Sequence, residues 1–426
     1  MKRTLKGFNR VLPVVLALFA GCASGTFADA AMSPADTALQ ALNALRAQAG
    51  MDGFSTEGRL AAAALGHARY LLAQPGAGHV QRRGGTGFTG VEPLDRARAA
   101  RYPAMLVSEN VAQGNTDADR ALAGLMAAIY HRFGFLDFDV DSVGIGYAAY
   151  RNRESSAGYV FLMGNSALAR LCGGKNFEGN GQYVYSVCDP DIRIEKRVYD
   201  GARGRFALKQ PEVVVWPPAD MQDVPPAFFD ESPDPLPDHE VSGYPISVSI
   251  NPYRVGTVRA HDFRLVDLDS GKAVSNLRRM DVSTDPNRKL DDHQFAWFPL
   301  QRLKWGGHYE ASVTLNLDGR VESRRWRFQV RDVPRPFYTV RVGTDQQAFV
   351  TDADGWLTVF VPPGGRRGVQ RLTTLEYRYP EGASVESEFF DGNTLRIRLR
   401  GQPGTKVRFE TDGGIHFDVV LAARRR

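Results

Sequence analysis

Cysteine and long apolar runs are both scarce in this sequence. The 426 residues hold three cysteines, and none of them stands in a C-x-x-C pair. Three cysteines are too few for a small disulfide-stapled scaffold, and their spacing does not match the ligand set of a zinc finger. Beyond the first thirty residues no apolar stretch reaches the length of about 20 residues that a membrane-spanning helix needs. The sequence therefore excludes a cysteine-rich miniature fold and predicts no transmembrane helix in the mature protein.

An excess of charge of one sign is also missing from most of the chain. The formal net charge is +5 and the sequence pI is about 9.0. Four positive residues, Lys2, Arg3, Lys6 and Arg10, stand at the very start, and their removal takes the formal +5 to +1. No basic stripe with interleaved aromatic residues follows, and the closing Arg424-Arg425-Arg426 is typical of a solvated tail. The sequence therefore argues against a nucleic-acid partner.

Residues 1–30 have the features of an export signal. Their basic start is followed by an apolar run, Val11 to Gly21, that is too short to span a bilayer. Two cleavage sites compete: Phe19-Ala20-Gly21-Cys22 is similar to a bacterial lipobox, which would leave Cys22 lipid-modified, whereas Ala28-Asp29-Ala30 is an ordinary secretory site. The lipobox is preferred because a loose run of small residues follows it. This predicts an outer-membrane or periplasmic lipoprotein, with a soluble secreted or periplasmic protein as the alternative.

The two cysteines beyond the leader, Cys172 and Cys188, form an even pair. In an exported protein such a pair is most simply a disulfide. It would close a glycine-rich loop of about fifteen residues, worth roughly 3 kcal/mol on a chain-entropy argument. A metal pair is the weaker interpretation, since no histidine flanks either cysteine.

Helical patterns occupy only the first third of the chain. We expect four helices, which begin at Asp36, Ser55, Pro93 and Asp117, and the last of them extends to Tyr130. Strands are expected between and after them, over residues 106–112, 143–149 and 159–163. These elements define a first domain over residues 34–168.

The remaining chain shows strand patterns of period two. Residues 169–239 are interpreted as a disulfide loop and a linker, because the Pro and Asp residues from Val213 to Pro237 do not suit a regular element. Residues 240–333 predict an immunoglobulin-like β-sandwich. Residues 336–426 predict a second, smaller β-sandwich, with turns at Asp354-Gly355, Asp391-Gly392 and Asp412-Gly413.

Short motifs follow one another through the first domain in a set order. They are Leu42-Asn43-Ala44-Leu45-Arg46, Ala63-Ala64-Leu65-Gly66-His67-Ala68, His79, Ser108-Glu109-Asn110-Val111-Ala112, His131-Arg132 and Val143-Gly144-Ile145-Gly146. This order and spacing resembles the CAP superfamily of cysteine-rich secretory, antigen 5 and pathogenesis-related proteins, and in particular its bacterial secreted branch. The resemblance covers residues 36–168, roughly a third of the chain.

The resemblance implies a fold and a cleft. The implied fold is a three-layer α-β-α sandwich, so the predicted class is multidomain α+β, with this CAP fold followed by all-β immunoglobulin-like domains. The implied cleft is lined by two histidines and two acids. Matched residue by residue, His79 and His131 are the histidines, Glu109 is the first acid, and Asn110 beside it is a further cleft candidate.

The sequence departs from the family pattern at two places. Ser108 replaces the glycine of the motif, and Ala127 and Ala128 stand where the second acid is expected. The resemblance therefore carries over three cleft residues and leaves the fourth without a match.

The chemistry of these side chains suits a metal ion. Two neutral imidazoles and a carboxylate that converge on one point can bind Zn²⁺, with water completing its shell. His79 and His131 are the candidate ligands, with Glu109 in support. Two alternatives stay open: Glu109 orients one of the histidines, or the residues form a hydrogen-bonded network that binds nothing. His67, on an apolar helix face, is expected to pack there with its hydrogen bonds satisfied.

Signals for catalysis are weak. Ser108 is the one hydroxyl beside the motif and lacks a G-x-S-x-G context, and no H-E-x-x-H pattern is present. The sequence therefore favours an exported binding module for a small apolar or lipidic ligand, a divalent cation or a cell-envelope component, with the β-sandwiches as arms. A metal-dependent hydrolase acting on peptide or cell-wall material is the alternative.

Overall fold

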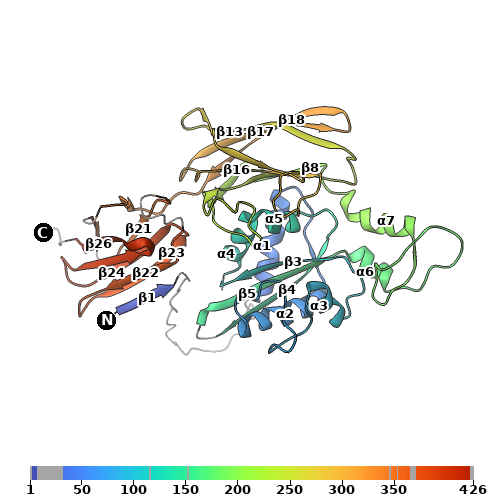
Figure 1. Ribbon diagram of the computed structural model, residues 1–426, viewed down its shortest axis with the longest axis horizontal. Coiled ribbons are helices and arrows are strands. Elements are labelled where there is room, and N and C mark those ends of the chain that lie inside the picture. The colour runs from blue at the N-terminus through green and yellow to red at the C-terminus, as the bar shows by residue number, and fades with distance from the viewer. Residues whose placement is uncertain are drawn as a thin grey trace, which may run out of the picture.

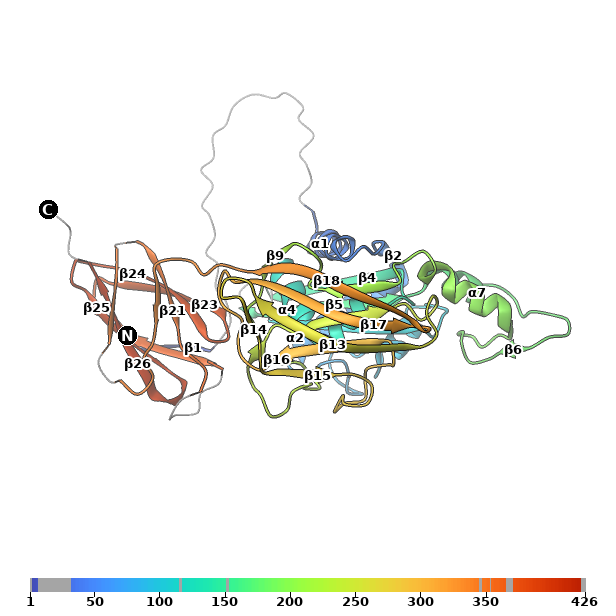
Figure 2. The same cartoon turned by 90° about the horizontal axis from the view of Figure 1, so that it is seen from above.

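Three modules are joined along an elongated molecule. The structure is a computed structural model that describes residues 2–6, 32–114, 117–150, 153–344, 347–352, 354–364 and 371–422. The first domain lies beneath a β-sandwich, and a second sandwich forms one end (Figure 1). A small extension with helix α7 forms the opposite end (Figure 2). Most of the predicted leader, Cys22 included, lies outside the described residues.

The first domain has three layers. Its sheet has the order β2-β4-β5-β3. The strands are β2 (Ser55–Thr56), β3 (Val107–Gln113), β4 (Ser142–Tyr150) and β5 (Arg153–Gly164). The helices are α1 (Pro34–Gln48), α2 (Gly58–Ala73), α3 (Pro93–Ala99), α4 (Ala118–Ala127) and α5 (Ile129–Phe135).

Alternation along β5 separates the two helical layers. Phe161 and Met163 pack in a hydrophobic cluster with α1, α4 and α5, whereas Val160 and Leu162 pack in another with α2 and α3. Successive side chains of a strand point to opposite faces, so this strand is apolar on both sides. The predicted multidomain α+β class with an α-β-α first domain is confirmed.

Two glycines let α2 pack directly on β4. A Cβ atom at Gly144 would lie 1.9 Å from the backbone nitrogen of Ala61, and one at Gly146 would lie 2.2 Å from the carbonyl carbon of Ala64. No side chain fits at either place, because real nonbonded contacts are far longer. The Val-Gly-Ile-Gly motif is therefore explained by close helix-on-strand packing.

The starts of two helices, α1 and α2, differ from the prediction, and that of α3 agrees with it. Ser33, not Asp36, caps α1, and its hydroxyl accepts a hydrogen bond from the N–H of Asp36. Glu57, not Ser55, caps α2, since Ser55 belongs to β2. Pro93 occupies the first turn of α3 as expected, because proline has no N–H to leave unbonded there.

The predicted linker is largely structured, which corrects the boundary drawn at residue 240. Helix α7 (Lys196–Ala207) and strands β8 (Val213–Trp216), β9 (Met221–Val224) and β10 (Ala227–Phe228) all lie within residues 169–239. Strand β8 pairs with β12 (Ile246–Ile250), and β9 pairs with β18 (Arg320–Val330). Proline suits the ends of such short edge strands, so its abundance did not mark a loop here.

The first sandwich therefore includes residues 213–224 as well as the predicted strands. One sheet has the order β15-β16-β12-β8, and the other has the order β14-β13-β17-β18-β9. The further strands are β13 (Val258–Asp267), β14 (Lys272–Ala273), β15 (Leu277–Met280), β16 (Gln294–Pro299) and β17 (His308–Leu317), and β10 pairs separately with β11 (Ser242–Gly243).

The C-terminal sandwich also has two sheets. Their orders are β1-β22-β25-β26-β20 and β19-β21-β24-β23. The strands are β1 (Lys2–Lys6), β19 (Phe337–Thr339), β20 (Ala348–Thr351), β21 (Trp356–Phe360), β22 (Thr374–Arg378), β23 (Ser384–Asp391), β24 (Thr394–Arg400), β25 (Lys406–Thr411) and β26 (Ile415–Leu421), with a 3₁₀ turn at Asp412–Gly414. Within the described part of the chain, no helix combines the length and apolarity of a membrane span.

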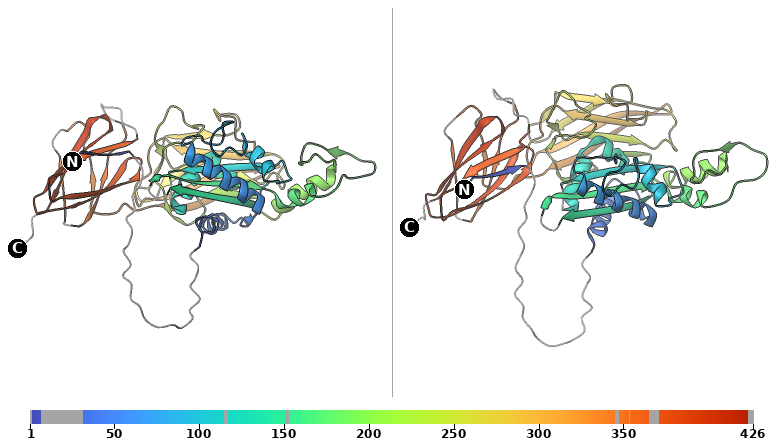
Figure 3. Two further views of the ribbon diagram at one scale, coloured as in Figure 1. Left: turned by 90° about the horizontal axis from the view of Figure 1, so that it is seen from below. Right: turned by 60° about the horizontal axis from the view of Figure 1, so that its bottom comes forward.

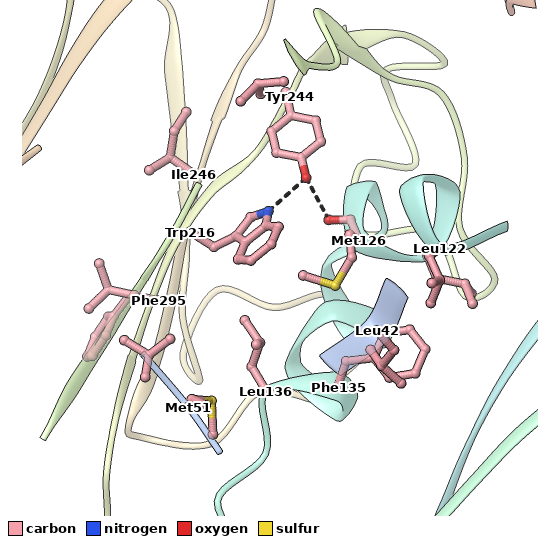
Figure 4. Close-up of a cluster of buried hydrophobic side chains, with 14 of the residues drawn as sticks. Leu42, Met51, Leu122, Met126, Phe135, Leu136, Trp216, Tyr244, Ile246 and Phe295 are labelled. Carbon is pink, nitrogen blue, oxygen red and sulfur yellow. Dashed lines mark hydrogen bonds between the residues drawn. The ribbon is translucent and has the colours of Figure 1, made fainter. Parts of the chain in front are cut away.

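The first domain and the first sandwich share one buried cluster. Figure 4 shows Tyr244 donating its hydroxyl hydrogen to the carbonyl oxygen of Met126 in α4 (3.0 Å) and accepting a hydrogen bond from the indole of Trp216 (2.8 Å). Arg132 in α5 is fully buried at the same joint and donates to the carbonyl of Pro245 (2.7 Å). The two modules are therefore packed together and not merely tethered.

Candidate functional site

The loop that carries His79 is anchored on helix α2. The ring of His67, fully buried on α2, bonds through Nε2 to the carbonyl of Gly78 (2.9 Å) and through Nδ1 to the amide of Gln81 (3.0 Å). Gly78 before His79 and Gln81 two residues after it are thereby tied to one side chain. The expectation that His67 is a packed histidine with satisfied hydrogen bonds agrees with these contacts, and they make it a positioning residue for His79.

The tautomer of His67 follows from its partners. The backbone N–H of Thr89 donates to Oε1 of Gln81 (2.7 Å), so the Nε2 amide of Gln81 must face His67 and donate to Nδ1. The proton of His67 is then on Nε2 and is donated to Gly78. Burial lowers the pKa of His67 to about 4, so the ring is neutral at ordinary pH.

Glu109 on β3 is held by a buried arginine. Nη2 of Arg96, on α3, lies 2.8 Å from Oε1 and 2.7 Å from Oε2 of Glu109, and both side chains are almost completely buried. Nη1 of Arg96 donates to the carbonyl of Val91 (3.0 Å). A buried ion pair needs such additional hydrogen bonds, because each charge has lost its water.

His79 completes this group and is partly exposed to solvent. Its Nδ1 lies 3.0 Å from Oε1 of Glu109, and 36% of its side chain is exposed. A carboxylate only accepts hydrogen bonds, so Nδ1 of His79 carries a proton, and in the neutral ring the lone pair is on Nε2. Glu109 therefore orients His79, which is one of the two alternatives weighed from the sequence.

His131 is positioned by an acid that the sequence analysis missed. The helix expected to run through Tyr130 breaks at Ala128, and His131 lies in the first turn of α5. Glu231, fully buried, accepts hydrogen bonds from Nδ1 of His131 (2.6 Å) and from the backbone N–H groups of His131 (3.0 Å) and Tyr130 (3.2 Å). The second acid of the cleft thus comes from residues beyond the first domain.

Asn110 stabilises the start of α5, which carries His131. It is buried, and its side-chain amide donates to the backbone carbonyl of His131 (2.8 Å). Asn110 therefore holds the helix that carries His131. Arg132, next to His131, is buried and donates to carbonyl groups at the joint with the sandwich.

Together these residues form the site that corresponds to the implied cleft, and it presents two imidazole rings side by side. The rings of His79 and His131 are stacked, with centroids 5.9 Å apart and planes inclined by 24°. Each ring uses Nδ1 for a buried carboxylate, and within the described residues no protein atom is hydrogen-bonded to either Nε2. The structure thus brings His79, Glu109 and His131 together, with Asn110 directly behind them.

The residues present fit a divalent cation with an open shell. Histidine ligands of zinc commonly donate their second N–H to a carboxylate, as both rings do here. Glu109 is occupied by Arg96 and His79, so the protein offers two nitrogen ligands, and water or a bound molecule would supply the others. Among the described residues, the three side chains whose ligand atoms do lie within 4.8 Å of one another are Asp291, Asp292 and His293. Both ring nitrogens of that histidine are already hydrogen-bonded.

A separate apolar cavity lies between α1, α4 and the first sandwich. Its volume is about 270 Å³, and it is lined by residues that include Leu45, Leu122, Met126, Trp216 and Tyr244. Figure 4 shows several of these side chains around the Tyr244 hydrogen bonds. The cavity is close to the lower size limit of small-molecule sites.

The predicted disulfide is present. Cys172, at the end of α6 (Ser166–Cys172), is bonded to Cys188, and their Cα atoms are 5.2 Å apart. It closes the loop before strand β7 (Ile194–Glu195), which pairs with β6 (Tyr183–Val184) in the extension that projects from the first domain (Figure 3).

Arg96, His67 and Glu231 are the functional residues that sequence reasoning left out. Arg96 lies in the helix predicted to begin at Pro93 but was not singled out, and His67 was assigned to packing alone. Glu231 lies in an acidic, proline-rich stretch without periodicity, and no sequence signal connects it with a histidine 100 residues earlier.

In comparisons with known proteins, a family model matches the same part of the chain. Residues 39–165 match the family model described as CAP, the cysteine-rich secretory protein family. Among solved structures, the chain is similar to an extracellular protein with an SCP domain from Bacillus anthracis, with 20% identity over 30% of this chain and a TM-score of 0.26. It spans 39% of that protein's length. An outer surface protein of Borrelia burgdorferi matches with 17% identity over 31% of this chain and 91% of its own, with a TM-score of 0.27. No curated protein matches the chain.

Proposed function

Since residues 39–165 form a CAP domain, we propose that this protein is an exported binding module whose cleft holds a divalent cation between His79 and His131. The observation that carries the proposal is the pair of stacked imidazoles, each with Nδ1 fixed by a buried carboxylate and Nε2 left for a ligand. Zn²⁺ is the cation that such a nitrogen pair favours. The cation would supply an open coordination position for an anionic or carbonyl group of a bound molecule.

Binding is favoured over hydrolysis because neither acid of the cleft is available as a general base. Glu109 accepts hydrogen bonds from Arg96 and His79, and Glu231 accepts three hydrogen bonds around His131. A base for a metal-bound water needs a free carboxylate oxygen within hydrogen-bond reach of that water. A metal-dependent hydrolase acting on peptide or cell-wall material remains the alternative that the experiments below separate.

A small apolar ligand is the second candidate, and the cavity at Trp216 and Tyr244 favours it. The cavity is bounded by helices of the CAP domain and by the first sandwich, and most of its lining is apolar. Displacement of water from such a surface is the usual source of affinity for an apolar molecule. A lipid or another apolar component of the cell envelope would suit it.

Export is part of the proposal and rests on two features. The leader over residues 1–30 has a basic start and a short apolar run, and the Cys172–Cys188 disulfide is typical of an oxidising compartment. We propose an outer-membrane or periplasmic lipoprotein anchored through Cys22, with the β-sandwiches as arms.

The cation site is tested by calorimetric titration of Zn²⁺ into the chain without its leader. We expect a dissociation constant on the order of micromolar, weaker than a four-ligand structural site. The double variant His79→Ala/His131→Ala should lose this binding. The matched control His261→Ala/His308→Ala removes two exposed histidines of the first sandwich and should retain it.

Absence of binding in the unaltered chain would contradict the cation proposal and leave the apolar ligand as the function to examine. Turnover of a peptide or cell-wall substrate that His79→Ala abolishes would instead favour the hydrolase.

A further inference from the structure

Three consecutive residues, Phe229, Asp230 and Glu231, connect the cleft with the C-terminal sandwich; we call them the strap. Glu231 turns into the CAP domain, where its carboxylate accepts three hydrogen bonds from Tyr130 and His131. Phe229 and Asp230 contact the C-terminal sandwich instead. The strap therefore contacts the binding site at one end and another module at the other.

The contacts at the C-terminal sandwich are close. The ring of Phe229 lies on Gly392 in the turn between β23 and β24, where a Cβ atom would be 2.6 Å from two ring carbons. The guanidinium of Arg371 lies 6.0 Å from the centre of the same ring and forms an ion pair with Asp230. The β23–β24 turn is thus packed against Phe229, and Asp230 is paired with a second residue of the same sandwich.

Arg302 of the first sandwich closes the other side of this joint. It is largely buried, and its Nη2 donates to Oδ2 of Asp391, beside Gly392 (2.7 Å). Its guanidinium also lies 5.8 Å from the centre of the Phe229 ring. Nearby, the rings of Trp305 and Phe390 are 5.8 Å apart. Arg302 therefore contacts both Phe229 and the β23–β24 turn of the C-terminal sandwich, and it holds the two together.

The strap has little slack between its two ends. A residue spans at most about 3.6 Å, so the Cα atoms of Phe229 and Glu231 are at most about 7 Å apart. Glu231 is buried with three donors around it, and a carboxylate moved from such a place loses hydrogen bonds that water does not replace. A displacement of Phe229 by an ångström or two must therefore disturb Glu231 or stretch the strap.

We infer that the strap is a positioning element of the cleft and that the C-terminal sandwich holds it in place. Glu231 fixes the orientation of His131, and the contacts of Phe229 and Asp230 fix Glu231. A partner that shifts the C-terminal sandwich would thereby change the cleft. Of the tests that follow, only the measurement of Zn²⁺ affinity depends on the proposed function.

Hydrogen exchange of the α5 start tests the inference without any metal. In the whole chain after its leader, Glu231→Ala should raise the exchange rates of the amides of Tyr130 and His131 about tenfold. Phe229→Ala and Gly392→Ala keep the Glu231 carboxylate but disturb the contacts that fix its position, so they should raise the same rates by a smaller factor. Glu231→Gln keeps an acceptor oxygen and should exchange more slowly than Glu231→Ala.

The control variant is Arg120→Ala. It removes an ion pair between α4 and Glu388 of β23, which joins the same two modules without touching the strap. The exchange of Tyr130 and His131 should stay at the unaltered rate in this variant.

A spectroscopic signature distinguishes positioning from a general loss of structure. In the chain labelled with ¹⁵N histidine, the ring nitrogens of His131 should report a proton on Nδ1, and Glu231→Ala should mix the two tautomers. His79 should keep its Nδ1 proton, because Glu109 is untouched. Zn²⁺ affinity, where it is measurable, should fall in the order of the exchange effects.

Unchanged α5 exchange in both Phe229→Ala and Gly392→Ala would overturn the coupling to the C-terminal sandwich. Unchanged exchange and tautomer in Glu231→Ala would overturn the positioning role itself. If zinc does not bind the unaltered chain, the proposed function fails, while the exchange and tautomer results still decide the inference.

Discussion

Nδ1 of His67 accepts a hydrogen bond from the side-chain amide of Gln81, at 3.0 Å, and this bond fixes the charge state of a buried histidine beside the cleft. Because the N–H of Thr89 occupies Oε1 of Gln81, the amide cannot turn to accept a proton from His67. If Nδ1 of His67 were protonated, its N–H would face the amide N–H of Gln81, and the hydrogen bond between them would be lost. The same ring bonds to Gly78 and Gln81 on either side of His79, so protonation of His67 would disturb the loop that positions His79.

Stability should fall as the pH drops from 6.5 to 4, in part through His67. Burial lowers the pKa of His67 in the folded state to about 4, whereas the unfolded chain takes up the proton near 6.5. The unfolded state binds more protons across this window, so this contribution is complete above pH 6.5 and is lost toward pH 4. The difference corresponds to ~3 kcal/mol at most. Urea denaturation at several pH values measures it.

The variant His67→Gln isolates that contribution. It should be less stable than the unaltered protein at pH 7.5, because the ring hydrogen bonds are gone, but its free energy of unfolding should decline less between pH 6.5 and 4. Parallel pH profiles for the two proteins would show that His67 does not titrate as expected.

Gly144→Ala should destabilise the CAP domain by about 3 kcal/mol or more, since overpacking against a backbone cannot be relieved by a side-chain rotation. The added Cβ would lie 1.9 Å from the nitrogen of Ala61. The control is Gly124→Ala on α4, where nothing lies within 4 Å and helix propensity predicts a gain of about 0.5–1 kcal/mol. Thermal unfolding of the two variants should move in opposite directions. Equal midpoints would refute the close packing of α2 on β4.

Arg96→Met should cost about 3–5 kcal/mol, because it leaves the Glu109 carboxylate buried without its cation. The double variant Arg96→Met/Glu109→Gln removes both charges and should recover part of that loss. Denaturant titration of the single and double variants gives the coupling energy. A double variant that is no more stable than Arg96→Met would indicate that charge burial is not the cause.

Cys22→Ser should change the mass and location of the mature protein. If the lipobox is used, the unaltered protein carries lipid on Cys22 and sediments with membranes, and the variant loses the lipid and the sedimentation. Intact mass spectrometry and membrane fractionation measure both. Identical mature masses would favour cleavage after Ala30 and a soluble exported protein.

Elements with strong periodicity were predictable from the sequence. Strand β17, within the residues predicted to form a β-sandwich, alternates cleanly between exposed and buried side chains because one of its faces is buried. Strand β8 was hidden because it is only four residues long and is followed directly by two prolines. Its role follows from pairing with β12, a tertiary contact that no local pattern encodes.

The site residues also separate into those that the sequence predicts and one that it does not. His79, Glu109 and His131 were found because family motifs mark them. Glu231 was not, since its function depends on where the first sandwich places an otherwise ordinary acidic residue. The expectation of a missing second acid arose from Ala127 and Ala128 at the end of α4, and the fold supplies that acid from residue 231 instead.

The cluster that joins Trp216 and Tyr244 to Met126 also bears on what counts as one folding unit. The apolar side chains of α1, α4 and α5 share a single interior with strands β8, β12 and β16. A fragment that ends near residue 165 would present this interior to water, and an exposed apolar surface of that kind promotes aggregation. The CAP domain and the first sandwich should therefore melt together in one cooperative calorimetric transition, and fragments should be cut after residue 333 rather than at the limit of the family match.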